Sequence, residues 1–73
     1  MNVKGCYKMY MLTVYNEKNK IVDSWAECTR VQIMARLRDD ERLFKLSRIN
    51  GVNVGNITQF KYENDFYAEV KSV

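Results

Sequence analysis

Alternating apolar and polar positions predict most of this chain as short β-strands. Between residues 7 and 15 both alternating sets are largely apolar, which is typical of a strand in the middle of a sheet. A polar loop over residues 16–19 follows, and its Asn19 suits a left-handed backbone conformation. The pattern resumes over residues 20–26, so the first third of the chain is predicted to form a β-hairpin.

One helical pattern follows this hairpin. Thr29 and Gln32 have the three-residue spacing of a capping box, in which each side chain bonds the backbone at the helix start. At about 100° per residue, one broad apolar stripe then forms; it contains Val31, Ile33, Met34, Ala35 and Leu37. Acidic residues are unfavourable at a helix C-terminus, so the acids at 39–41 predict that the helix ends between residues 38 and 40.

Two turn signals divide the C-terminal half. Asn50-Gly51, between apolar neighbours, is the strongest short-range indication of a two-residue hairpin turn. It predicts one strand over residues 43–49 and a long one over 52–63, with a bulge or corner at Gly55-Asn56. Asn64-Asp65 predicts a second turn before a last strand over residues 66–71.

These elements predict a single small α+β domain over residues 1–73. The order is β-β-α-β-β-β, with an antiparallel sheet of about five strands and one helix packed on one face; residues 1–6 are expected to be frayed. One helix cannot cover both faces of such a sheet. The second face is expected to curl into a partial barrel, to pair with another copy or to receive a partner.

Composition removes much catalytic chemistry. The chain has no histidine, which removes the usual general base and any histidine-paired nucleophile. Two cysteines alone do not complete a four-ligand zinc site. We therefore assign no catalytic, cofactor-binding or metal-binding residue, expect no cofactor, and expect a protein that is not an enzyme.

Cysteine use and hydropathy bear on location. Cys6 and Cys28 are expected to be free, partly buried thiols, with a single disulfide as the alternative. No apolar run approaches the roughly 18 residues of a membrane span, and the N-terminus lacks a basic-then-apolar signal. The expected location is the cytoplasm of the producing or host cell, without membrane attachment.

Aromatic and basic residues are the candidate binding groups. We expect a protein interface on an apolar-aromatic sheet face; its anchors are Tyr10, Trp25, Tyr62 and Tyr67, with Arg36 and Arg38 at the rim. This hypothesis includes self-association as a homodimer through the same face.

The alternative is a single-stranded DNA- or RNA-binding protein with a basic, aromatic sheet face; its contacts are Lys8, Arg36, Lys61 and Lys71. A net charge of +3 is mild for a nucleic-acid binder and favours a protein partner. A structural component of a larger assembly is the second alternative.

From Arg36 onward the chain resembles the epsilon subunit family of RNA polymerase from Gram-positive bacteria. The shared features are a helix before Leu43-Phe44-Lys45-Leu46 and the run Phe60-Lys61-Tyr62-Glu63-Asn64 before a closing strand. The resemblance implies a small non-catalytic protein, but that family is acidic, and no functional residue is carried across. The length and the Asn/Lys/Tyr-rich composition also look like small proteins of phages and mobile elements. This likeness implies a regulator or inhibitor of a host machine for transcription, nuclease activity or defence.

Overall fold

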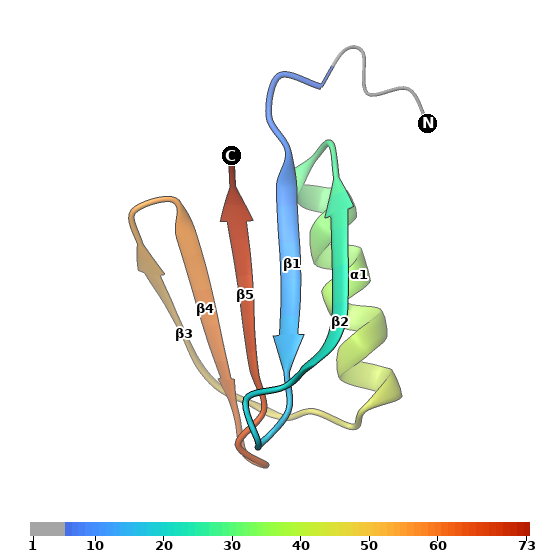
Figure 1. The fold of residues 1–73 in the computed structure, drawn as a ribbon, viewed down its shortest axis with the longest axis vertical. Helices are drawn as coiled ribbons and strands as arrows, with labels where there is room; N and C mark the ends of the chain where they lie inside the picture. The colour runs from blue at the N-terminus through green and yellow to red at the C-terminus, as the bar shows by residue number, and fades with distance from the viewer. Residues whose placement is uncertain (1–5) are drawn as a thin grey trace.

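The computed structural model describes residues 6–73 and confirms the α+β fold, with the elements in the order expected (Figure 1). The elements are β1 (Tyr10–Tyr15), β2 (Ile21–Glu27), α1 (Arg30–Leu43), β3 (Arg48–Val54), β4 (Ile57–Tyr62) and β5 (Tyr67–Ser72). All pairings are antiparallel, in the order β2-β1-β5-β4-β3. The sheet is not closed into a barrel, and β2 and β3 are its two edges. No helix in the described part of the chain is long and apolar enough to cross a membrane.

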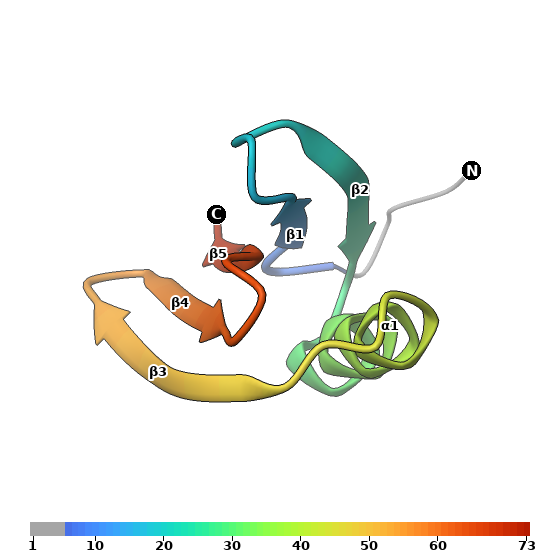
Figure 2. The same cartoon turned by 90° about the horizontal axis from the view of Figure 1, so that it is seen from below.

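The sheet bends strongly, and α1 lies on its concave side, where it contacts β1 and β2 (Figure 2). The core fills this concavity and combines residues from β1, β4, β5 and α1: Leu12, Val14, Ile33, Leu37, Phe60, Tyr62, Ala68 and Val70. As expected, β1 is central, with β2 on one side and β5 on the other. The convex side is covered by no element of the described chain. We call it the open face; strand register assigns to it Met11, Thr13, Tyr15, Ser24, Ala26, Asn50, Val52, Val54, Ile57, Gln59, Lys61, Tyr67, Glu69 and Lys71.

The turn predicted at Asn50-Gly51 is wrong. Both residues lie inside β3, and the chain reverses at Gly55-Asn56, where only a corner was expected. Gly55 has a φ of 62°, as a type II′ turn requires at its first central position. Gly51 has a packing role instead. A Cβ there would lie 3.0 Å from Cε1 of Phe60, so the ring packs directly against the glycine backbone.

The helix is longer than predicted, because its terminal acids have partners or are buried. It continues to Leu43, and Lys45 then takes a φ of 55° that ends it. Asp39 approaches Arg42 at 3.9 Å, and Glu41 binds Arg48 and Tyr62 at 2.6 Å each. The strand expected over residues 43–49 is therefore mostly helix end and loop, and β3 begins at Arg48.

Other local predictions are confirmed. Asn19 and Asp65 have φ values of 61° and 66°, in the two loops where turns were expected. Thr29 caps α1, its Oγ1 accepting from the Gln32 N–H at 3.2 Å. The Gln32 side chain accepts from the Thr29 hydroxyl at 3.0 Å and does not complete the reciprocal bond of a capping box.

The expectation of free thiols is also corrected. Cys6 and Cys28 form a disulfide with a Cα–Cα distance of 5.3 Å. It joins the segment before β1 to the connection between β2 and α1. The fraying expected over residues 1–6 falls outside the described residues except at Cys6, which this bond holds to Cys28.

Candidate interaction surfaces

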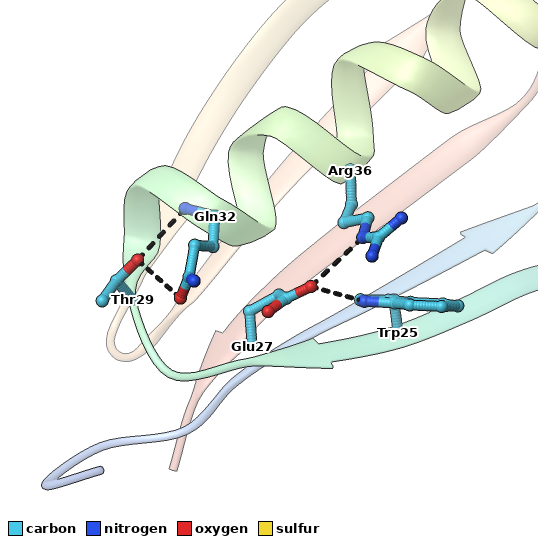
Figure 3. Close-up of polar contacts among 5 residues, drawn as sticks. All are labelled: Trp25, Glu27, Thr29, Gln32 and Arg36. Atoms are coloured by element: carbon cyan, nitrogen blue, oxygen red, sulfur yellow. Dashed lines mark hydrogen bonds and ion pairs between the residues drawn. The ribbon is translucent and has the colours of Figure 1, made fainter. Parts of the chain in front are cut away.

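Trp25, Glu27 and Arg36 form a polar and aromatic cluster where α1 crosses β2 (Figure 3). Trp25 and Glu27 are two residues apart on β2, so their side chains lie on the same face, the one toward the helix. Glu27 Oε2 accepts from Trp25 Nε1 at 2.6 Å and from Arg36 Nε at 3.1 Å. The Arg36 guanidinium lies 4.0 Å from the centre of the indole ring. Sequence analysis named Trp25 as an anchor and Arg36 as a rim residue of one interface, and the structure places the two in direct contact.

This cluster is exposed but held in place. Trp25 is 42 % exposed, and the Arg36 side chain 44 %. Hydrogen bonds from Trp25 and then from Arg36 lower the pKa of Glu27. The carboxylate thus stays ionised and keeps both partners bound. The cluster could contact a ligand or partner through the indole face that Arg36 leaves free. Its ion pair between Arg36 and Glu27 also links α1 to β2.

A second group of aromatic residues lies on the open face. Tyr15 and Tyr67 are opposite each other on β1 and β5, with ring centroids 5.6 Å apart. The Tyr67 hydroxyl donates to Glu69 at 3.1 Å. Partial burial and this carboxylate raise the pKa of Tyr67 to about 12, so the phenol remains a neutral donor at physiological pH.

Two of the predicted cations lie on the open face with these tyrosines. Lys61 is directly opposite Tyr67 across β4 and β5, and Lys71 is two residues beyond Glu69 on the same face. Both lysines are exposed. The other two members of the predicted nucleic-acid set lie elsewhere, since Arg36 is on the helix side and Lys8 precedes β1. The four cations therefore do not form one surface.

Tyr62 does not belong to a surface. It is 1 % exposed and its hydroxyl donates to Glu41 Oε2 at 2.6 Å. Burial, and then the Glu41 carboxylate, raise the pKa of this phenol. The same carboxylate oxygen accepts from Arg48 at 2.6 Å. The proposed anchor role of Tyr62 is replaced by a core role, in which it links the end of α1 to β3 and β4.

The remaining predicted residues are dispersed. Tyr10 is half-buried against the core, and Arg38 is exposed on α1 beside Val31 and Met34. Sequence analysis missed Tyr15, Glu27 and Glu69 as site residues. Their signal was available in strand alternation, but only the pairing of β1 with β5 shows that Tyr15 meets Tyr67.

Within residues 6–73, no three His, Cys, Asp or Glu side chains gather where they could hold a metal ion. Asp23 and Asp40 do approach each other between β2 and α1, as a pair of carboxyl groups.

Comparison with protein-family models, curated proteins and solved structures found no match for this chain.

Proposed function

We propose that this protein is a non-enzymatic protein-binding module that uses the open face. The observation that supports the proposal is the uncovered convex side of the sheet, which carries the paired rings of Tyr15 and Tyr67. Tyrosine is common at protein interfaces because its ring buries apolar area while its hydroxyl keeps a hydrogen bond. Met11 and Val52 extend the apolar part of this surface and are 42 % and 48 % exposed.

Charge on the open face favours a protein over a nucleic acid. Lys61 and Lys71 would attract phosphate, and a tyrosine ring of the Tyr15–Tyr67 pair could receive a base. Glu69, however, lies between Tyr67 and Lys71 on the same strand face, and its carboxylate would repel a phosphate backbone. Alternating charges of this kind suit a protein partner with complementary groups. Single-stranded nucleic-acid binding is the second candidate.

A small regulator or inhibitor of a macromolecular machine is the role that we propose for such a module. A rigid scaffold that displays one face can block or bridge a larger partner by occupancy alone. The tyrosine pair would act as the anchor, and the two lysines with Glu69 would select the partner by charge.

Affinity capture from a lysate of the source cells, with and without nuclease, tests this function. The tagged native chain is compared with the double variant Tyr15→Ser/Tyr67→Ser and with the control Val31→Ser, whose native side chain is 80 % exposed on α1. We expect a discrete protein partner that survives nuclease and the control, and that falls at least about tenfold with the tyrosine variant.

Three outcomes would contradict the open-face proposal. Capture that survives the tyrosine variant but is lost with Trp25→Ser would assign binding to the helix side. Capture that disappears on nuclease treatment would support nucleic-acid binding. So would binding to an oligonucleotide whose log affinity falls linearly with the log of the salt concentration. If none of these variants changes the amount of captured partner, neither the open face nor the helix side is the binding surface. Circular dichroism of each variant shows whether the fold is retained.

A further inference from the structure

β3 is an edge strand with unusual exposure. All seven of its residues are exposed, and within the described residues it pairs with β4 alone. Ile49, Val52 and Val54 are 62 %, 48 % and 57 % exposed. No charged residue occurs between Ile49 and Val54. A strand edge of this kind presents unpaired backbone groups next to apolar side chains, which favours pairing with another strand.

The opposite edge of the sheet differs in each of these respects. β2 carries Asp23 and Glu27, and its register with β1 shifts near Val22. The helix also packs against it. Charges, irregular register and a covering helix are the devices that keep a sheet edge from pairing. They protect β2, and none of them occurs over residues 50–54 of β3, because the register shift of this strand lies before Asn50.

The hairpin at Gly55-Asn56 determines which backbone groups of β3 point outward. In a two-residue hairpin the flanking residues, here Val54 and Ile57, form a hydrogen-bonded pair. Because such pairs alternate along an antiparallel ladder, Val52 also bonds toward β4. The N–H and C=O groups of Gly51 and Asn53 therefore point toward the free edge.

We propose that β3 pairs antiparallel with β3 of a second copy of this chain, with Val52 opposite its counterpart. In this register Gly51 of each copy exchanges two hydrogen bonds with Asn53 of the other, so every outward group over residues 50–54 is paired. The two Val52 side chains meet across the two-fold axis as a close, non-hydrogen-bonded pair. The regular segment available for this pairing ends at the register shift before Asn50 and at the turn after Val54.

A second copy can pair with this edge because no like charges meet there. Arg48 is the one charged residue of β3, and it lies four residues from the proposed axis. Antiparallel pairing places the two arginines on opposite sides of the axis, about 27 Å apart along the strands. The net positive charge of the chain therefore does not oppose contact at the edge itself. The dimer would have one ten-stranded sheet with the two open faces side by side, and the proposal does not depend on what those faces bind.

Charge exchange at Val52 tests both the dimer and its register. Val52→Lys and Val52→Asp each place like charges directly opposite each other, and we expect either substitution to raise the dimer dissociation constant at least about tenfold. Mixing the two variants pairs lysine with aspartate and should restore association to within about threefold of the native chain. Ile21→Lys on β2, where the native side chain is 61 % exposed, is the matched control and should leave the dimer intact. Sedimentation equilibrium between about 10 µM and about 1 mM covers the range of small interfaces.

Amide hydrogen exchange on the native chain supplies a test that needs no variant. As concentration rises, the N–H groups of Gly51 and Asn53 should become protected, while those of the β2 edge should not. A native chain that stays monomeric throughout the range overturns the proposal. A dimer that Val52→Lys does not weaken, or variants whose mixture stays monomeric, also overturn it. The Tyr15→Ser/Tyr67→Ser protein should still dimerise, so failure of the edge contact and failure of partner binding are separate results.

Discussion

Asp40 shows how a single residue can oppose the sequence pattern around it. It lies in the last turns of α1, is 7 % exposed, and its Oδ2 has no hydrogen-bond donor. Burial, and then the neighbouring Asp23 carboxyl group, raise the pKa of Asp40 to about 7. Two carboxyl groups can bond each other only when one of them is protonated. Sequence reasoning ended the helix between residues 38 and 40, because acids are unfavourable at a helix C-terminus, and did not predict that Asp40 is buried inside the helix.

Asp40 should make the protein less stable as pH rises. Its pKa in the folded state is above the ordinary value of 3.8, so the folded state binds the proton more tightly than the unfolded state. The resulting stabilisation is complete below about pH 4 and is lost as pH rises through 7. We expect Asp40→Asn to remove about 2 to 4 kcal/mol of this pH dependence and to be more stable than the native chain at pH 8. Urea unfolding between pH 4 and pH 8 measures the difference. Glu17→Gln, in the exposed loop between β1 and β2, is the control, and parallel stability curves for the native chain and Asp40→Asn would contradict this account.

At the scale of elements, local signals succeeded where the determining contacts are themselves local. The Thr29 cap and the turns at Asn19 and Asp65 involve only neighbouring residues, and all three were predicted. Asn50-Gly51 carried an equally clear turn signal that the fold does not use. The ring of Phe60 packs on Gly51 from the adjacent strand, a contact that no local pattern reveals. The chain turns instead five residues later, at Gly55-Asn56, where the sequence pattern predicted only a bulge or corner.

Removing the α1 cap should destabilise the fold by a modest amount. Thr29→Ala leaves the Gln32 N–H without its acceptor, and we expect the free energy of unfolding to fall by about 1 kcal/mol. Thr29→Ser keeps the hydroxyl and should retain most of that stability. Urea unfolding at constant m-value distinguishes the two variants. An alanine variant as stable as the native chain would show that water replaces the cap without cost.

At the scale of the whole molecule, the disulfide connects parts of the chain that sequence reasoning treated separately. Cys6 and Cys28 are 22 residues apart, and their bond closes the β1–β2 hairpin into a loop. Such bonds persist in oxidising compartments and are rare in a reducing cytosol. The cytoplasmic location expected from the sequence stays a prediction, and the disulfide opposes it.

Loss of the disulfide should be costly for a domain of this size. A loop of this length predicts that Cys6→Ser/Cys28→Ser lowers the free energy of unfolding by about 3 kcal/mol, mainly because the unfolded chain gains freedom. Reductant should destabilise the native chain by a similar amount and leave the double variant unchanged. Thermal and urea unfolding with and without reductant make this comparison. Equal stability of oxidised and reduced native protein would mean that the bond adds nothing to folding.

The sequence by itself determined the order of elements, the single helix, the central position of β1 and the shortage of helix to cover the sheet. Each of these features depends on the short-range periodicity or the composition of one segment, and both can be read from that segment alone. The tertiary structure decided the true β3–β4 turn, the burial of Tyr62 and Asp40, and the meetings of Trp25 with Arg36 and Tyr15 with Tyr67. These depend on strand register and on packing across the core. Segments distant in the chain set both, so no local pattern specifies them.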